Sequence, residues 1–144
     1  MKLEEIYAEW NTDCEIDKTE LGDESLKICK LHNKYYKVYT SERLLCRKLQ
    51  ADMKQLRLAK HEFYSQGPSK EQMDAGWELP PKGLILKADL PMYIDADREI
   101  VELSLRIGYQ EEKIELCESI LKSLQWRGNR IGKAIDWIKW TSGG

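Results

Sequence analysis

The chain has 144 residues, a length typical of a single domain. Its 25 acidic side chains slightly outnumber its 23 basic ones. No apolar run approaches the roughly 20 residues of a bilayer-spanning helix, and the acidic N-terminus lacks the apolar segment of a signal peptide. Five Trp and seven Tyr against four Pro argue against disorder, so composition predicts a folded, soluble, intracellular protein with no membrane partner.

The first predicted element is a short amphipathic helix at the N-terminus. Leu3, Ile6, Tyr7 and Trp10 recur at helical spacing, and polar residues over 11–17 predict a turn after them.

A much longer basic helix is predicted next. Apolar or small residues recur in alternating three- and four-residue steps over residues 28–63, and only Glu42 and Asp52 interrupt the register. No Pro or Gly lies within residues 24–65, so nothing in this stretch breaks a helix chemically.

The ends of this helix also carry signals. Asp23 or the Thr19-Glu20 region can supply the N-terminal cap, and Gly67-Pro68 predicts the stop. At 1.5 Å per residue, about 40 residues would reach roughly 60 Å. Such a rod cannot bury its apolar stripe against itself, so we expect it to pack on another helix.

A connector rich in Gly and Pro follows, over residues 67–94. Its one apolar run, Leu84-Ile85-Leu86, predicts either a short edge strand or a strap packed on the helices.

The second long helical pattern opens at Asp95 or Asp97 and continues to Ile138. Gln110 and Gly128 are the register positions that fail, and Gly128 predicts a break that leaves a short basic terminal helix. The Asp95-x-Asp97 pair could hold Mg²⁺, but carboxylates before a helix are more often its N-terminal charge, so we interpret the pair as a cap.

The predicted fold class is therefore mainly α. Two long helices are joined by the irregular connector, with short helices at both termini. We expect residues 1–98 to hold the acidic N-terminal helix, the basic helix and the connector, and residues 99–144 to form a helical oligomerisation region.

The small net charge hides strongly segregated blocks. Residues 1–25 carry a net charge of −7, residues 26–61 of +8, residues 62–121 of −7 and residues 122–144 of +4. Separation of acidic and basic residues into blocks says more about binding partners than the net charge of the whole chain does.

Catalysis and metal binding find little support. No Gly-rich phosphate loop, G-x-S-x-G or H-E-x-x-H motif is present, and the chain has only two His. The cysteines lack paired zinc spacing, and nothing completes a site around Cys29-x-x-His32, so we interpret them as reduced packing thiols. The sequence predicts a protein that is not an enzyme and needs no cofactor.

Nucleic acid is the better-supported ligand class. The +8 block holds ten cations interleaved with Tyr35, Tyr36 and Tyr39 and followed by Phe63 and Tyr64, which combines phosphate-binding charge with rings on which bases stack. A basic helix face is also often just solvated or paired with an acidic neighbour. Tyr35 and Phe63 fall on the apolar register, which favours a core position, whereas Tyr36 and Tyr64 fall off it.

One stretch resembles the signature of the UvsY family of bacteriophage recombination mediator proteins. It closes the long basic helix and reads Arg57-Leu58-Ala59-Lys60-His61-Glu62-Phe63-Tyr64-Ser65. Further short segments fit the family in order: Ile16-Asp17, Glu24-Ser25-Leu26-Lys27-Ile28, His32-x-Lys34-Tyr35-Tyr36, Tyr93-Ile94-Asp95-Ala96-Asp97, Arg127-Gly128 and Ala134-Ile135-Asp136-Trp137.

The resemblance implies a mediator of homologous recombination and repair in the cytoplasm of the infected bacterial host. Such proteins bind single-stranded DNA, help displace the single-strand-binding protein and load a RecA-like recombinase. They form homo-oligomers, hexamer- or heptamer-like rings. Carried over by position, Arg57 and Lys60 are the DNA contacts. The charge count adds Lys54, Arg47 and Lys48, and Tyr64 is the candidate stacking ring.

An oligomer also has support from the residues themselves. The stripe from Ile100 to Ile138 is wide, and three of the five Trp lie in the last 19 residues. We expect subunit contacts at Leu121, Leu124, Ile131, Ile135, Ile138 and Trp137.

Two alternatives remain open at this point. The long helices could pack as an antiparallel hairpin within one chain. The protein could also be a helical coiled-coil adaptor or assembly scaffold that binds no nucleic acid. Pairing of Arg47, Lys54, Arg57 and Lys60 with the acids of residues 1–25 or 99–118 would favour the adaptor, and an unpaired stripe of these cations would favour DNA binding.

Overall fold

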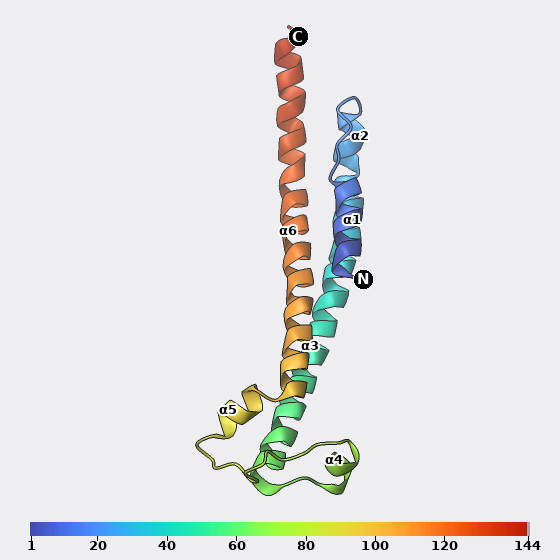
Figure 1. Cartoon of the computed structure of the whole chain (residues 1–144). Coiled ribbons are helices and arrows are strands. Elements are labelled where there is room, and N and C mark those ends of the chain that lie inside the picture. Colours follow the sequence, from blue (N-terminus) through green and yellow to red (C-terminus); the bar gives the residue numbers. More distant parts are fainter. Residues whose placement is uncertain (144) are drawn as a thin grey trace. The chain divides into compact units, whose positions relative to one another are not determined.

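The computed structural model of the chain describes residues 1–143, and six α-helices make up its regular structure (Figure 1). In chain order they are α1 (Leu3–Asp13), α2 (Leu21–Leu26), α3 (Ile28–Gln66), α4 (Lys70–Asp74), α5 (Leu90–Asp95) and α6 (Arg98–Thr141). The mainly helical class is confirmed. Gly144, the last residue of the predicted oligomerisation region, lies outside the described residues.

Two compact units divide the chain. The first comprises Met1–Leu44 with Gln110–Gly144, and the second comprises Leu45–Tyr109. Both α3 and α6 contribute to both units, so the units do not follow the division at residue 98 that the sequence suggested. The reason is that a unit needs a stretch of each long helix to bury an apolar stripe.

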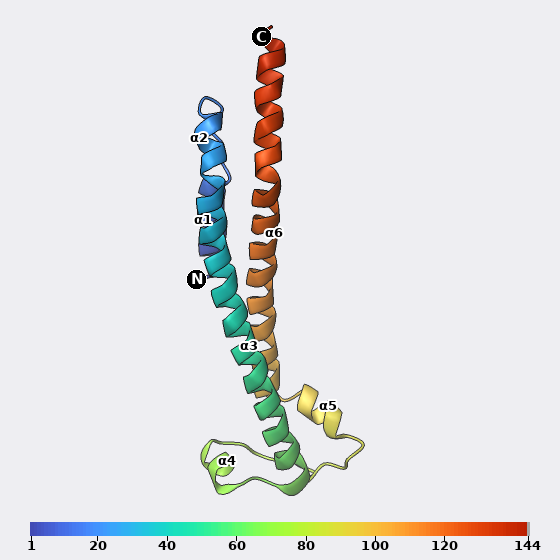
Figure 2. The same ribbon diagram turned by 180° about the vertical axis from the view of Figure 1, so that it is seen from behind.

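In the first unit, α1 runs back along the beginning of α3 (Figures 1 and 2). The ring of Trp10 meets that of Tyr35 edge-on, with centroids 5.5 Å apart. The buried core consists of Ile6, Tyr35, Cys117, Ile120 and Leu124. The predicted N-terminal helix is thus confirmed, and its apolar face packs into this core.

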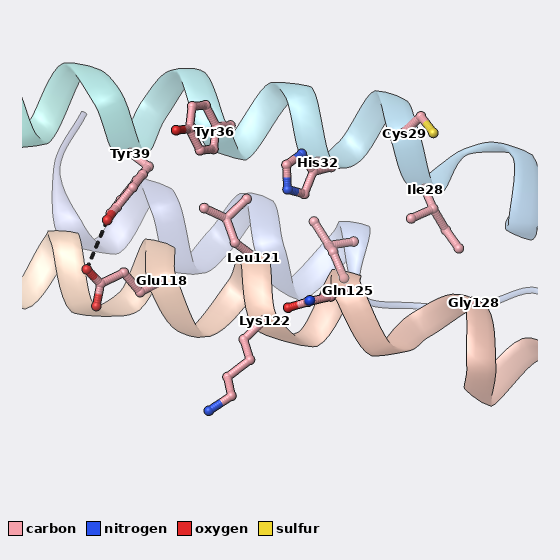
Figure 3. Close-up of a pocket in the computed structure, with 11 residues that line it drawn as sticks. Ile28, Cys29, His32, Tyr36, Tyr39, Glu118, Leu121, Lys122, Gln125 and Gly128 are labelled. Atoms are coloured by element: carbon pink, nitrogen blue, oxygen red, sulfur yellow. Dashed lines mark hydrogen bonds between the residues drawn. The ribbon is translucent and has the colours of Figure 1, made fainter.

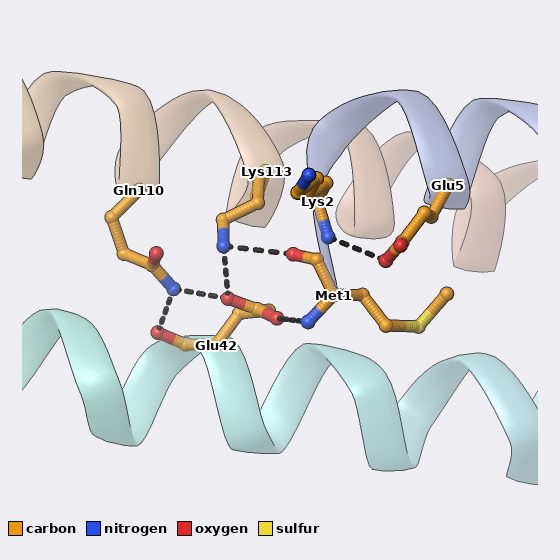
Figure 4. Close-up of polar contacts among 6 residues, drawn as sticks. All are labelled: Met1, Lys2, Glu5, Glu42, Gln110 and Lys113. Carbon is orange, nitrogen blue, oxygen red and sulfur yellow. Dashed lines mark hydrogen bonds and ion pairs between the residues drawn. The ribbon is translucent and has the colours of Figure 1, made fainter.

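A buried polar cluster crosses the same unit (Figure 4). Lys113 Nζ lies 2.8 Å from Glu42 Oε2, and the N-terminal ammonium of Met1 lies 3.2 Å from Glu42 Oε1. Gln110 donates both to the Glu42 carboxylate and, at 2.8 Å, to its backbone carbonyl. Glu42 and Gln110, at which the two predicted apolar registers fail, therefore meet and satisfy one another.

The second unit joins the end of α3 to α4, the connector, α5 and the beginning of α6. Its buried core consists of Phe63, Tyr64, Ile85, Leu90, Ile94 and Ile100. Trp77 packs on Phe63 with ring centroids 5.3 Å apart, so the connector covers the end of α3 rather than hanging free.

The long helices pack against one another inside each unit, and they do so antiparallel. In the first unit Tyr39 bonds Glu118, and Ile28 lies beside Gly128. In the second unit Lys60 of α3 lies 3.6 Å from Glu99 near the beginning of α6, and Met53 lines one pocket together with Ser104. The expectation that each long helix packs on another helix is therefore confirmed, and inside each unit the partner is the other long helix of the same chain, as in the antiparallel alternative.

The helix ends follow the sequence signals in two of three cases. Gly67 has a φ of +95°, and its N–H bonds the Phe63 carbonyl at 3.0 Å, which closes α3 as predicted. Asp97 Oδ1 accepts from the N–H groups of Glu99 at 3.0 Å and Ile100 at 3.3 Å, so Asp97 caps α6. Of the two predicted caps of the basic helix, Asp23 is wrong because it lies inside α2, whereas Glu20 of the Thr19-Glu20 alternative is the N-cap residue of α2, without a side-chain cap bond, and α3 itself begins only at Ile28.

The predicted break at Gly128 is also wrong, since α6 continues through this residue to Thr141. A glycine inside a helix costs only about 1 kcal/mol relative to alanine. The buried neighbours Arg127 and Ile131 hold the helix in place here. Packing therefore outweighs the local preference.

Residues 84–86 do not form the edge strand that was one of two expectations. Ile85 is buried, and its N–H bonds the Tyr64 carbonyl at 3.0 Å, while Leu84 and Leu86 stay exposed. No second extended segment pairs with this run in the described part of the chain. It is a strap over the end of α3.

Candidate nucleic-acid interface

The second unit carries an exposed row of cations on α3. Arg47, Lys48 and Lys54 are all exposed, and none of them has an ion pair among residues 1–143. They lie on a helix without Pro or Gly, which holds them at fixed spacing. These three predicted DNA contacts are therefore accessible to phosphates.

Arg57 occupies an intermediate position. Its side chain is 45% exposed, and one terminal nitrogen lies 2.8 Å from Asp95 Oδ1. A guanidinium has five donors, so this pair leaves others available to a phosphate oxygen. Asp95 thus orients Arg57 while partly neutralising it.

Lys60 is buried, which corrects its prediction as a DNA contact. Its side chain is 4% exposed, and Nζ lies 3.2 Å from Asp97 Oδ2 and 3.6 Å from Glu99 Oε1. The same ammonium sits 3.5 Å from the centroid of the Trp77 ring. In this fold the lysine holds the second unit together and is not accessible to a strand.

Tyr64 is likewise buried and does not offer its ring for stacking. Its hydroxyl donates to Asp97 Oδ2 at 2.7 Å, and burial, followed by this hydrogen bond to a carboxylate, raises the pKa of the tyrosine. Burial opposes ionisation of Asp97, but the hydrogen bonds from Tyr64, the Ile100 N–H and Lys60 outweigh it and lower the pKa of that carboxyl. Together with the Glu99 N–H, these groups give the buried Asp97 carboxylate four donors.

The basic residues of α3 in the first unit also divide into cations that form ion pairs and cations that do not. Lys34 pairs with Glu9 at 3.1 Å and with Asp13 at 2.6 Å, so its charge is used inside the unit. Lys30 and Lys37 are exposed, without an ion pair in the part of the chain that the structure describes. The acidic N-terminal block therefore neutralises only part of the basic block.

An apolar groove of about 680 Å³ lies between α3 and α6 of the first unit (Figure 3). His32 and Tyr36 stack along α3 with ring centroids 5.8 Å apart, and Leu121 faces them from α6. The Tyr39 hydroxyl donates to Glu118 Oε1 at 3.1 Å across one end of the groove. Tyr36, which fell off the predicted apolar register, is exposed here.

The predicted subunit contacts separate into buried and exposed residues. Leu124 and Ile131 are buried inside the first unit, which corrects their assignment, because a side chain packed within its own chain is not available to a partner. Leu121 and Ile135 are half-buried. Ile138 and Trp137 are exposed, the latter to 67%, and so are Trp126 and Trp140.

Arg127 is a structural residue that inspection of the sequence did not single out for this role. It is buried, and its guanidinium donates to the backbone carbonyls of Asp13 at 2.8 Å and Glu15 at 2.9 Å. Glu24 Oε2 lies 3.6 Å from the same group. No local signal distinguishes this arginine from its exposed neighbour Arg130.

Other ligand classes find no site in residues 1–143. No group of three His, Cys, Asp or Glu side chains there could hold a metal ion. No helix among these residues is long and apolar enough to cross a membrane.

Comparison with known proteins agrees with this arrangement. The family model described as "Recombination, repair and ssDNA binding protein UvsY" matches residues 9–144. No curated protein sequence matches the chain.

Solved structures of the bacteriophage T4 recombination mediator protein UvsY share the fold. One, in lattice type IV, has a TM-score of 0.80 at 20% identity, covering 98% of this chain and 99% of that one. Lattice type I gives 0.82 at 19% identity, over 95% and 98% of the two chains. Lattice type II gives 0.80 at 22% identity, over 100% and 99%.

Because the family model matches residues 9–144, almost the whole chain, the chain belongs to the UvsY family of recombination, repair and ssDNA-binding proteins.

Proposed function

We propose that this protein is a recombination mediator that binds single-stranded DNA through the exposed cations of α3. It then helps displace the single-strand-binding protein and loads a RecA-like recombinase during phage recombination and repair. The role is non-enzymatic and is exercised in the cytoplasm of the infected host.

The unpaired cations of the second unit carry the proposal. Arg47, Lys48 and Lys54 lie on one rigid helix, and Arg57 adds a partly paired guanidinium. Contacts of this kind bind a backbone without regard to sequence and are strongly weakened by salt. A few contacts per chain are modest, but copies in a ring acting on one strand would bind tightly through avidity.

Membership of the family supports the mediator role, and the T4 protein of the matching structures is a recombination mediator protein. We propose a hexamer- or heptamer-like ring in this protein too. Ile138 and Trp137, with Trp140 beside them, stay exposed on α6 and are the apolar residues that a second copy would cover.

A coiled-coil adaptor that binds no nucleic acid remains the second candidate. The pairing of Lys60 with Glu99 favours it, because Lys60 was one of the two strongest sequence candidates for DNA and Glu99 belongs to the acidic segment 99–118. The unpaired state of Arg47, Lys48 and Lys54 favours DNA binding.

Fluorescence anisotropy of labelled oligo(dT) over a salt series separates the two functions. The test variant is Arg47→Ala/Lys48→Ala/Lys54→Ala. The control, Lys122→Ala/Arg130→Ala/Lys133→Ala, removes the same charge from exposed residues of α6 that have no ion pair within residues 1–143.

We expect the wild type to bind with a steep salt dependence. At about 0.7 per phosphate contact, the test variant should lower the slope of log affinity against log salt by about 2, whereas the control should leave it nearly unchanged. Absence of binding at low salt by correctly assembled protein would reject the mediator and leave the adaptor. Equal loss in both triple variants would reject the site on α3.

A further inference from the structure

A second cavity, of about 510 Å³, lies where α3 faces the connector and α5 in the second unit. From α3 it is lined by Arg57, Leu58 and His61, and from the other side by Lys87, Pro91 and Ile94. Its size falls within the range of small-ligand pockets. Neither the sequence motif nor the exposed row of cations includes Lys87.

The rim of this cavity is cationic and its inner wall is apolar. Lys87 is exposed and has no ion pair in the described part of the chain, and Arg57 keeps donors beyond the one that Asp95 takes. Leu58 lies in the interior of α3 and its side chain is 61% exposed, so an apolar side chain faces solvent here. Apolar contact surface flanked by cations is the combination that a nucleotide requires, because its base is flat and largely apolar on its faces and its phosphate is an anion.

The cavity also continues the row of exposed cations. Arg47, Lys54, Leu58 and His61 stand seven, four and three positions apart, so they share one face of α3. A backbone that follows Arg47 and Lys54 along this face arrives at Leu58. At Leu58 the surface changes from exposed cations alone to cations beside apolar side chains.

We infer that this cavity holds one nucleotide of the bound strand, with its base against Leu58, Pro91 and Ile94 and its phosphate between Arg57 and Lys87. The inference rests on the proposed binding of single-stranded DNA and adds a base contact to it. It makes the protein prefer single strands, because the bases of a duplex are paired and stacked and cannot enter.

The experiment compares oligo(dT) with an abasic strand of the same length and charge. Wild type, Leu58→Ala, Lys87→Ala and the control Lys70→Ala are titrated with each strand by fluorescence anisotropy. Leu58, Lys87 and Lys70 are exposed, so none of these changes removes core packing, and thermal unfolding confirms that each variant folds. Lys70 belongs to the same connector and has no ion pair among residues 1–143, which makes it the matched control.

We expect Leu58→Ala to weaken binding of oligo(dT) about fivefold and to leave binding of the abasic strand unchanged. Lys87→Ala should weaken both strands and lower the salt slope by about 0.7, and Lys70→Ala should change neither. If wild type binds oligo(dT) but Leu58→Ala and Lys87→Ala behave as Lys70→Ala does, the cavity is not a nucleotide site, although the proposed function stands. If wild type binds neither strand, the proposed function and this inference both fail.

Discussion

Lys60 and Asp97 form a buried ion pair in the second unit, with Nζ and Oδ2 3.2 Å apart and side chains only 4% and 8% exposed. The pair ties the end of α3 to the residue that caps α6. It also explains why two cations only three positions apart have different environments. Arg57 is solvated beside an exposed carboxylate, whereas Lys60 points under the connector and is covered by Trp77.

Replacement of Lys60 should therefore damage stability rather than DNA binding. Lys60→Ala leaves Asp97 as a buried charge without its cation, and we expect it to lower the free energy of unfolding by about 3 to 5 kcal/mol in urea denaturation. Where the variant is still folded, its affinity for oligo(dT) should stay within about twofold of the wild type.

The matched control is Lys54→Ala, which removes an exposed lysine from the same helix and should change stability by no more than about 0.5 kcal/mol. Lys60→Met/Asp97→Asn should recover much of the loss, because methionine fills the space and asparagine can still cap α6. A stable Lys60→Ala protein that no longer binds DNA would contradict this assignment.

The Glu42 cluster predicts how stability changes in acid. Burial opposes ionisation of Glu42, but hydrogen bonds from Lys113, Gln110 and the N-terminus outweigh it and hold the pKa below the ordinary 4.5. A depressed folded-state pKa means that the stabilisation is complete above pH 4.5 and is lost as the pH falls through the lower folded value.

Glu42→Gln should therefore be less stable than the wild type at pH 7, and its stability should fall less steeply below pH 4.5. Urea denaturation at a series of pH values measures both effects. Glu118→Gln, which changes an exposed carboxylate of the same unit, is the comparison. If the stability of Glu42→Gln falls as steeply below pH 4.5 as that of the wild type, this carboxylate is not the source of the loss of stability in acid.

The continuity of α6 at Gly128 can be tested by adding a methyl group. A Cβ at this position would lie 3.7 Å from Ile28 Cδ1, which is an ordinary contact. Gly128→Ala should raise the thermal midpoint, since alanine favours a helix over glycine by about 1 kcal/mol. Gly132→Ala, where a Cβ would meet nothing within 4 Å, should act in the same direction. A destabilised Gly128→Ala would instead indicate that the helix needs a bend at this residue.

The exposed end of α6 predicts which substitutions alter the oligomer without unfolding the chain. Ile138→Asp and Trp137→Asp place a charge on apolar surface that is exposed in the single chain, so we expect normal helix content and a smaller native mass in sedimentation. Ile131→Asp should lose helix content as well, because Ile131 is buried within the first unit. An unchanged mass for both exposed variants would remove these residues from the proposed subunit contact.

Local sequence signals identified the elements whose causes are themselves local. The length of α3, which contains no Pro or Gly, the stop at Gly67 and the Asp97 cap each depend on residues within a few positions of one another. Gly128 is the exception, because the buried Arg127 beside it is held by the backbone carbonyls of Asp13 and Glu15, which are distant in sequence. The same holds for Ile85, whose strap conformation depends on the carbonyl of Tyr64.

For the candidate site, the sequence alone was sufficient to locate the basic helix with its cations and to identify the family resemblance. The division of those cations into solvated and buried ones required the tertiary structure. In the sequence, Lys60 and Arg57 are both cations of the same basic helix, and nothing beside them distinguishes their environments. Only the folding of Trp77 and Asp97 onto α3 removes one of them from water. The cavity beside Lys87 has the same origin, since Leu58 and Lys87 are 29 positions apart and come together only when the connector closes over the helix.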